Sequence, residues 1–437
     1  MHIPTYHNPQ VGSPSSLAAI KVKNWQQFGK VEIDFHPNLT ILTGANGAGK
    51  TTLLNILAKH FDWNFRNLAM RNNKGGVTRN TRFKLRRYEY AGEEEFENIG
   101  EIEYENGDSA RIVAALKPKN PQFEDDSPEY TLELIDQHTV YGLFIPSHRP
   151  TYTYQALESI PVRPHEMSKK KAFEQLINEF RSKLFNQTYG QQPKSTSYRI
   201  KEVLTAWSAF GYSSERSEGR PDFVENFERF ESILRKLLPD SLKFKGLKIE
   251  NGEVILDCAT KPFFIDSASG GITSIIDIAW QIFMYHEDKD KSFVVIIDEV
   301  ENHLHPALQR LMLPKLIAAF PNVKFVVSTH SPLMVNSVRD SYVYALKYEN
   351  DEVVSLKLDL QHNAKSSSQI LDEVLGVAFN MPVWAESIVD GLVSKISGGD
   401  ISEQSFKLLR HDLADAGLGN LVPEAIEKLV KEKEVEE

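Results

Sequence analysis

The sequence has 437 residues, 41% of them hydrophobic and 25% charged, and its formal net charge is −10 at pH 7. These values predict a globular protein of one large or two smaller domains, and the acidic balance excludes a surface that is basic throughout. The single cysteine, Cys258, excludes an intrachain disulfide and fits a reducing compartment. The sequence has no signal-peptide pattern and no run of about 18 apolar residues, so we expect a cytoplasmic protein without a membrane segment.

After an N-terminus expected to be flexible (residues 1–17), the first predicted element is a strand, a glycine-rich turn and a helix, "NLTILTGANGAGKTTLLNILAKHF". The turn matches G-x-x-x-x-G-K-[ST], in which backbone N–H groups close around phosphate oxygens. Lys50 is expected to reach the β and γ phosphates, and the Thr51 hydroxyl to bind Mg²⁺. The residues predicted to hold the nucleotide are Gly44, Ala45, Asn46, Gly47, Ala48, Gly49, Lys50, Thr51 and Thr52. The strand before and the helix after favour a nucleoside triphosphatase over a chance glycine-rich turn.

Two charge blocks of opposite sign follow the phosphate loop. Residues 66–87 carry eight Lys or Arg and no acid, and Tyr88–Asp108 carries nine acids and no base. One interpretation is a surface lobe whose two halves neutralise each other. The other is a basic surface at 66–87 for DNA or an acidic phage protein, with an affinity that falls steeply with salt. The sequence leaves both interpretations open.

The next 150 residues predict a β-rich part and then a helical part. Residues 101–116 predict a hairpin with an Asn106-Gly107 turn, and "TLELI" and "YGLFIPS" predict further strands. Three amphipathic segments between about 167 and 238 predict helices, which are "KKKAFEQLINEFRSKLF", "TSYRIKEVLTAWSAF" and "FVENFERFESILRKLL". They lack a sustained heptad, so long coiled-coil arms are not expected. Asn251-Gly252 predicts another hairpin.

Acidic side chains follow a buried strand in "FVVIIDEVENHLHP". Asp298, at the tip of the strand, is predicted to bind Mg²⁺, and Glu299 to act as the general base that polarises the attacking water. Alternation along a strand sends these two side chains to opposite sides, so their roles should differ. Upstream, Ala268-Ser269-Gly270-Gly271 precedes an apolar helix. Downstream, "VKFVVSTHSPLM" delivers His330 to the carboxyl end of another strand, where a γ-phosphate contact is expected.

Two other kinds of site are weighed for these residues. His303 and His305 together with the acids could form a metal site, but the ligand set is incomplete, and Pro306 is typical of the first residue of a helix. Ser147-His148 has no partner acid that the sequence identifies, which disfavours a serine hydrolase.

Taken in order, the phosphate loop, "ASGGI", "IIDEVENHLHP" and "STHSP" resemble the ATP-binding-cassette ATPases of the Rad50, RecF, SMC and OLD type. The last two motifs resemble the OLD-like ATPases of bacterial anti-phage systems such as PARIS and Septu. The resemblance covers roughly residues 18–60, 100–155 and 240–350. It implies an α/β fold, in which the ATPase head is a mixed P-loop sheet flanked by helices, with an antiparallel β lobe, a helical insertion and a small helical C-terminal region.

The resemblance also implies roles for single residues. Lys50, Glu299 and His330 would be catalytic, with ATP as the nucleotide and Mg²⁺ held by Thr51 and Asp298. Ser269, Gly270 and Gly271 would contact ATP held by a second protomer, with Asn302 and His303 at that interface. Gln155 would form the Q-loop. For Trp25 or Phe28 two interpretations stay open, a ring that stacks on adenine and a plain core aromatic. The partner would be at least a second copy in an ATP-sandwich dimer, with a larger ring as the alternative.

The predicted domains are an ATPase core at 18–165 and 240–360 with a charged insertion at 61–100, a helical insertion at 166–239, and a docking or oligomerisation region at 361–437. This tail has no D-x-D pair of a Toprim nuclease, and "HDLAD" is interpreted as a solvated helix face. We therefore expect an ATPase that serves as sensor or scaffold in anti-phage defence and controls a separate effector, a nuclease, by nucleotide-dependent assembly. The alternatives are a RecF- or Rad50-like repair ATPase that acts on DNA and, less favoured, the energising subunit of a transporter.

Overall fold

The computed structural model describes residues 15–68, 96–115, 129–149, 152–184, 194–213, 218–286, 293–359, 383–397, 403–423, 425–426 and 428–429. The chain divides into two compact units, Met1–Ala364 and Lys365–Glu437, and each is described here by itself. Residues 69–95 lie outside the described residues, and with them most of the basic stretch predicted to bind DNA or a protein.

A 12-stranded sheet runs through the first unit in the order β4-β7-β6-β5-β1-β2-β15-β14-β3-β13-β12-β8. Its strands are β1 (Leu17–Trp25), β2 (Phe28–Asp34), β3 (Leu39–Gly44), β4 (Asn67–Leu68), β5 (Phe96–Tyr104), β6 (Ser109–Ala115), β7 (Glu129–Ile135), β8 (Gly142–Ile145), β12 (Phe293–Ile297), β13 (Val323–Ser328), β14 (Tyr342–Glu349) and β15 (Glu352–Leu358). The neighbours β14, β3, β13, β12 and β8 pair in parallel, and all but β14 are buried along their whole length. Burial on both faces explains their continuous apolar sequences.

The remaining strands form an antiparallel lobe that continues the same sheet. β15 pairs antiparallel with β14 and parallel with β2, and from β2 outward to β4 every pairing is antiparallel. β5 and β6 confirm the predicted hairpin, with Glu103 opposite Ser109 and Gly107 at φ 89°, a left-handed conformation that glycine adopts without strain. A mixed sheet with an antiparallel lobe confirms the predicted fold class.

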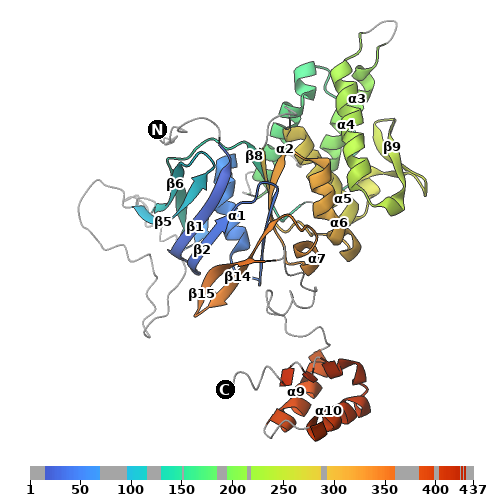
Figure 1. Cartoon of the computed structure of the whole chain (residues 1–437). Helices are drawn as coiled ribbons and strands as arrows, with labels where there is room; N and C mark the ends of the chain where they lie inside the picture. The colour runs from blue at the N-terminus through green and yellow to red at the C-terminus, as the bar shows by residue number, and fades with distance from the viewer. Residues whose placement is uncertain are drawn as a thin grey trace. The chain divides into compact units, whose positions relative to one another are not determined.

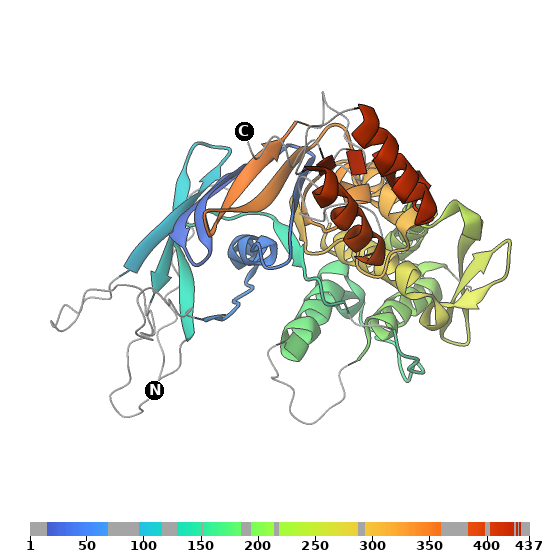
Figure 2. The same ribbon diagram turned by 90° about the horizontal axis from the view of Figure 1, so that it is seen from below.

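The helix that follows the phosphate loop lies on the concave side of this sheet (Figure 2). α1 (Lys50–Ala58) contacts β3 and β13, and the short η1 (Lys59–Phe61) extends it. α5 (Gly270–Tyr285) contacts β8, and the helix α6 (Pro306–Ala319) packs against the one-turn α7 (Pro332–Val335). The remaining short helices of this unit are η2 (Pro164–Met167), η3 (Asp240–Leu242) and η4 (Ile265–Ser267).

A helical lobe, α2 (Lys169–Leu184), α3 (Thr196–Gly211) and α4 (Pro221–Leu237), lies beside α5 and away from β1, β2, β5 and β6 (Figure 1). It confirms the three predicted helices. Buried aromatic rings join the lobe to α5, and the centroids of Phe230 and Trp280 are 4.8 Å apart. Such pairs stabilise by about 0.5–1.5 kcal/mol beyond burial alone. In the described part of the chain no helix exceeds the 17 residues of α4, so no long arm is present there.

A second, 3-stranded sheet, β9 (Phe244–Glu250), β10 (Glu253–Cys258) and β11 (Phe263–Phe264), precedes α5. Asn251 at φ 53° and Gly252 at φ 81° form the predicted tight turn, in which both residues are left-handed. Cys258 ends β10 with only 3% of its surface exposed, and burial raises the pKa of its thiol.

The second unit is a small helical body. It contains α9 (Val383–Ser397), α10 (Glu403–Asp415) and η5 (Gly419–Leu421) around an apolar core that includes Val389, Leu409 and Leu413. In "HDLAD", His411 and Asp415 are exposed, which confirms a solvated helix face. Among the described residues, no helix is long and apolar enough to cross a membrane.

Candidate functional site

The phosphate loop connects β3 to α1 through three glycines in left-handed conformations. Gly44, Gly47 and Gly49 have φ values of 142°, 81° and 89°. A Cβ atom on Gly49 would lie 2.3 Å from the ring of Phe28, so this position requires glycine for space as well as for backbone conformation. The loop therefore presents its backbone N–H groups at the N-terminus of α1, a geometry that binds phosphate.

Lys50, the first residue of α1, is only 5% exposed. Its ammonium group donates hydrogen bonds to the carbonyl oxygens of Gly44 (2.8 Å) and Ala45 (3.0 Å). Burial lowers the pKa of Lys50 to about 8, although the carboxylates of Asp298 and Glu299 oppose this shift. The loop thus holds one desolvated cation where the triphosphate is predicted to lie.

We expect ATP binding to weaken above pH 8. The pKa of Lys50 is about 8, so without nucleotide the ammonium loses its proton above that pH, whereas bound phosphate favours the charged form. The dissociation constant for ATP should rise about tenfold per pH unit from about pH 8 to about pH 9.5. Titrations of the intact chain across this range measure the slope. A Lys50→Arg variant, whose guanidinium does not titrate there, should show a flat profile, and an equal slope in both proteins would exclude Lys50 as its cause.

Asp298 follows the buried strand β12 and faces the phosphate loop. The Thr51 hydroxyl donates to Asp298 Oδ2 at 2.9 Å, and the Ser328 hydroxyl donates to Oδ1. Burial raises the pKa of Asp298 above its ordinary value of 3.8, although the hydroxyls of Ser328 and Thr51 and the charge of Lys50 oppose this shift. A hydroxyl and a carboxylate side by side fit Mg²⁺, which takes few protein oxygens and fills its other positions with phosphate and water.

Glu299 follows Asp298 beyond the end of β12 and is more exposed. Asp298 is 1% exposed, whereas the Glu299 side chain is 34% exposed. The Glu299 N–H donates to Ser328 Oγ at 2.7 Å, and its Oε2 accepts a hydrogen bond from Asn302 Nδ2 at 2.8 Å. Its φ of 46° is left-handed, which costs a residue with a Cβ about 1–2 kcal/mol. The surrounding hydrogen bonds hold the carboxylate in this strained position.

His330 lies at the carboxyl end of β13, beside the acids. Its Nε2 is 3.9 Å from Glu299 Oε1, and its backbone N–H donates to the carboxylate of Glu301. Burial, and then the charge of Lys50, lowers the pKa of His330 below its ordinary 6.5. The ring is therefore neutral at pH 7 and can donate one hydrogen bond to a phosphate oxygen.

Arg149 is a site residue to which sequence reasoning gave no role. It is 4% exposed, and its guanidinium donates to the carbonyl oxygens of Asp298 (3.4 Å) and Glu299 (3.0 Å). On the same turn, the Ser147 carbonyl accepts a hydrogen bond from Asn302 Nδ2 at 3.0 Å. One feature of the sequence could have indicated this role, since Arg149 lies in "IPSHRP", just after β8. β8 pairs in parallel with β12, so the carboxyl ends of the two strands meet.

The segment Ala268-Ser269-Gly270-Gly271, called the signature below, lies at the N-terminus of α5. Ser269 is the N-cap of this 16-residue helix, Ser269 and Gly270 are exposed, and Gly271 is half-buried. Gly271 packs against the loop after Asp298, where an added Cβ would lie 3.1 Å from the carbonyl oxygen of His303. This helix end therefore offers its N–H groups to solvent.

The two histidines after the acids have separate surroundings. His303 has a left-handed φ of 67°, and His305 is the N-cap of α6, where its Nδ1 accepts a hydrogen bond from Ala307 N at 3.3 Å. No group of three or more His, Cys, Asp or Glu in the described residues could hold a metal ion.

Two weaker predictions differ from the structure. Gln155 was expected in a Q-loop, but its Oε1 accepts a hydrogen bond from Ser195 N and its carbonyl accepts one from Lys201, so the side chain caps α3. For Trp25 and Phe28 the structure contradicts the adenine-stacking interpretation and confirms the alternative of core aromatics, because they are 0% and 1% exposed and stack on each other. The early aromatics are core residues, because β1 and β2 lie inside the sheet.

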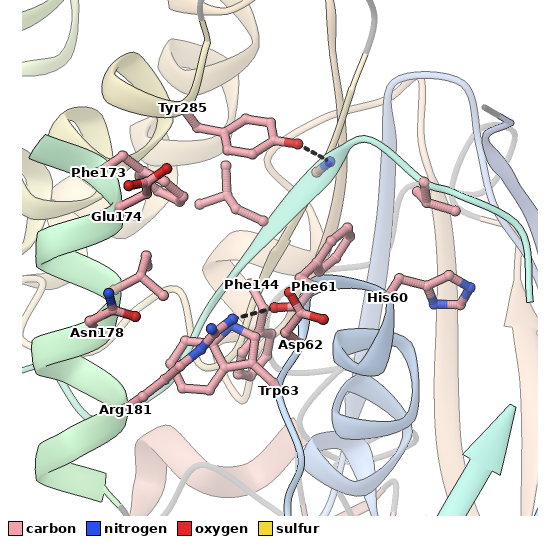
Figure 3. A pocket seen from close by; sticks show the side chains of 14 residues that line it. His60, Phe61, Asp62, Trp63, Phe144, Phe173, Glu174, Asn178, Arg181 and Tyr285 are labelled. Carbon is pink, nitrogen blue, oxygen red and sulfur yellow. Dashed lines mark hydrogen bonds between the residues drawn. The ribbon is translucent and has the colours of Figure 1, made fainter. Parts of the chain in front are cut away.

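A cavity of about 280 Å³ lies at the far end of α1, between η1, β8 and α2 (Figure 3). The Arg181 guanidinium lies 5.3 Å from the centre of the Trp63 ring and donates to the carbonyl oxygen of Phe61. The Tyr285 hydroxyl accepts a hydrogen bond from the N–H of Gly142 at 2.7 Å. The cavity marks the joint between the phosphate-loop helix and the helical lobe, and it is separate from the nucleotide site.

A parallel sheet with a phosphate loop, two acids and a histidine at its carboxyl edge defines a P-loop ATPase of the ABC type. The chain belongs to the family described as "AAA domain, putative AbiEii toxin, Type IV TA system", whose model matches residues 39–336. Membership in this ATPase family implies that the chain binds ATP.

Similar proteins include members of two named systems, a retron and Septu. Retron Ec83 probable ATPase from Escherichia coli is 22% identical over an alignment of 407 residues. The match covers 77% of this chain and 72% of that protein. Septu protein PtuA from Bacillus thuringiensis is 20% identical over 392 residues, 86% of this chain and 88% of that protein. These matches confirm the predicted resemblance to the ATPases of Septu.

Two further likenesses are more limited. DNA replication and repair protein RecF from Lactococcus lactis is 44% identical over 45 residues, 10% of this chain and 12% of that protein. The SMC head domain from Thermotoga maritima superposes with a TM-score of 0.39 at 14% identity, covering 78% of this chain and 99% of that chain.

Proposed function

We propose that this chain binds and hydrolyses ATP with Mg²⁺, held by Thr51 and Asp298, which would shield the phosphate charge. Lys50 holds the triphosphate, Glu299 acts as general base, and the neutral His330 contacts the γ-phosphate. The proposal rests on one observation, the convergence of these five side chains from the start of α1 and from the loops after β12 and β13 at one edge of the sheet.

Catalysis is proposed to need a second copy of the chain. The Ser269 helix end is exposed and contacts the His303 loop, and helix N-termini attract phosphate. In a head-to-tail pair, Ser269, Gly270 and Gly271 of each copy would close the nucleotide site of the other. A two-fold pair would then hold two ATP molecules, which act as a bridge until hydrolysis.

The biological role proposed is anti-phage defence. The similarity to Septu protein PtuA and to a retron ATPase supports it. Because the described residues contain no cluster that could hold a nuclease metal, cleavage of nucleic acid is assigned to a separate effector chain. The ATPase would act in the cytoplasm as sensor or scaffold and gate that effector through its nucleotide state, with residues 361–437 as the docking or oligomerisation region.

A RecF-like repair ATPase that acts directly on DNA is the second candidate. The 44% identity to RecF over 45 residues favours it, and residues 66–87 would supply the basic surface. This candidate predicts a DNA affinity that depends on ATP and is lost when Arg82, Lys84, Arg86 and Arg87 are replaced with alanine.

A pull-down of tagged Glu299→Gln chain from its own host with Mg·ATP tests the role. We expect a stoichiometric partner that carries a metal-nuclease motif, and we expect the Lys50→Ala chain not to recover it. Recovery of DNA with replication or recombination proteins, and no such partner, would replace the defence role with repair. Co-purification of a membrane permease would instead indicate a transporter subunit.

A further inference from the structure

The buried guanidinium of Arg149 is bound to main-chain oxygens instead of carboxylates. The carboxylates of Asp277, Asp298, Glu299 and Glu301 act on it electrostatically, yet within the described part of the chain none lies within ion-pair distance. Its hydrogen bonds go to the carbonyl oxygens of Asp298 and Glu299, and a weak one of 3.5 Å goes to Pro146. A charged donor that is desolvated and bound in this way fixes the path of the backbone it contacts.

The residue that Arg149 contacts most closely is strained. Glu299 is left-handed at φ 46°, and such a conformation persists only where the surroundings impose it. Arg149 holds its carbonyl at 3.0 Å, while Ser328 Oγ accepts from its N–H at 2.7 Å. The peptide groups on both sides of the Glu299 side chain are thereby anchored, and their geometry decides where the carboxylate stands.

The segment Tyr152–Gln155, which follows Arg149 closely in the sequence, contacts both α5 and the helical lobe. The Tyr152 hydroxyl donates to Asp277 Oδ1 at 2.8 Å, on the helix that begins at the signature. Gln155 binds the N-terminus of α3 and, through its carbonyl, the ammonium of Lys201 at 2.6 Å. The segment therefore links the helix α5, which begins at the signature, to the helical lobe, and it lies a few residues after Arg149, which binds the loop of Asp298 and Glu299.

Lys201 anchors this segment firmly. Its side chain is 0% exposed, and its ammonium lies 2.7 Å from Asp266 Oδ2 and 3.1 Å from Glu253 Oε2. Asp266 is three residues before Ser269, so the same buried cation ties the segment to the start of the signature. A movement of the helical lobe relative to the sheet must act on both Gln155 and Asp266.

We propose that Arg149 is a positioning residue for ATP hydrolysis: it holds the main chain of Glu299 so that the carboxylate reaches the attacking water, and Tyr152–Gln155 makes this placement depend on the helical lobe. The inference rests on the proposed ATPase function. In the part of the chain that the structure describes, the hydrogen bonds of Arg149 go to Pro146, Asp298 and Glu299 and to none of the residues predicted to hold phosphate, so its loss should change turnover and leave nucleotide binding nearly unchanged.

The test compares kcat and KM for Mg·ATP in Arg149→Met, Arg149→Lys and wild-type chain. We expect kcat to fall at least tenfold in Arg149→Met with KM within about twofold, since small misplacements of a catalytic group cost up to about 100-fold. Arg149→Lys keeps a charged donor and should recover part of the loss. Arg181→Met is the matched control, because Arg181 also donates to a backbone carbonyl but at the far end of α1. It should leave kcat and KM within about twofold.

Tyr152→Phe removes only the hydroxyl that binds Asp277, and it tests the coupling even where Arg149→Met does not fold. It should lower kcat by a smaller factor, about threefold, with an unchanged KM. The inference would be overturned if the Arg149→Lys and Tyr152→Phe chains had the same kcat as the wild-type chain. It would also be overturned if the variants of Arg149 and Tyr152 lost no more kcat than Arg181→Met. A wild-type chain without any turnover would instead overturn the proposed function.

Discussion

Replacement of Glu299 with glutamine is expected to lower kcat for ATP hydrolysis by about 10²- to 10⁴-fold, the usual contribution of a general base. The amide keeps the size of the side chain and still accepts the hydrogen bond from Asn302 Nδ2, so the strained loop should keep its shape. It cannot take the proton of the attacking water. Binding of ATP should persist, because Lys50 and the phosphate loop are untouched, and the paired state should accumulate.

Single-turnover phosphate release and size-exclusion chromatography with Mg·ATP measure these effects. Glu301→Gln is the matched control, since it removes the same charge from the same loop but from a carboxylate whose partner is the backbone N–H of His330. An amide oxygen can still accept that bond, so we expect kcat to fall less than about tenfold. Turnover in Glu299→Gln equal to that of the control would remove Glu299 from the role of base.

Replacement of Lys50 with alanine is expected to weaken ATP binding at least about 100-fold, or about 2.8 kcal/mol. The variant removes the cation, which is 5% exposed, and leaves the carbonyl oxygens of Gly44 and Ala45 without their donor. A triphosphate brought into the loop would then meet these oxygens and Asp298 with no compensating charge. Calorimetric titration with ATP and Mg²⁺ measures the loss, and affinity within about threefold of wild type would contradict it.

Mixing this variant with a signature variant tests whether the site is composite. Ser269→Arg should be inactive alone, because a large side chain would block the exposed helix end. In an equal mixture, half of the pairs contain one of each chain and each such pair has one complete site, so about a quarter of wild-type activity should return. Ser267→Arg, on the exposed turn two residues earlier, should stay active alone. No recovery on mixing would exclude a shared site.

The nucleotide site was predictable because its parts are local. Strand, glycine turn and helix occur within one stretch around Lys50, and the acids directly follow the apolar strand β12. Parallel pairing of β3, β13 and β12 then brings the strand ends together without further information. That is why Thr51 and Asp298, 247 positions apart, were assigned to one site and lie in hydrogen-bond contact.

Contacts that depend on packing were not predictable. Arg149 binds the backbone of a residue 150 positions away, and a carbonyl oxygen has no sequence signature. Gln155 was assigned by its place after a strand, but the N-terminus of α3 and Lys201 decide its direction. The sequence left open whether Trp25 stacks on a base or lies in the core, because the burial of an aromatic ring depends on neighbours far away in the chain.

The buried Cys258 makes the molecule convenient for spectroscopy. It is the single cysteine, it is 3% exposed, and burial raises the pKa of its thiol, so little of it is in the reactive thiolate form. A cysteine placed at the exposed Ser267 would therefore take a maleimide dye or a nitroxide selectively in the otherwise native sequence. Energy transfer between two such labels would follow, in real time, whether the helix ends of two copies approach when ATP is added and separate after it is hydrolysed.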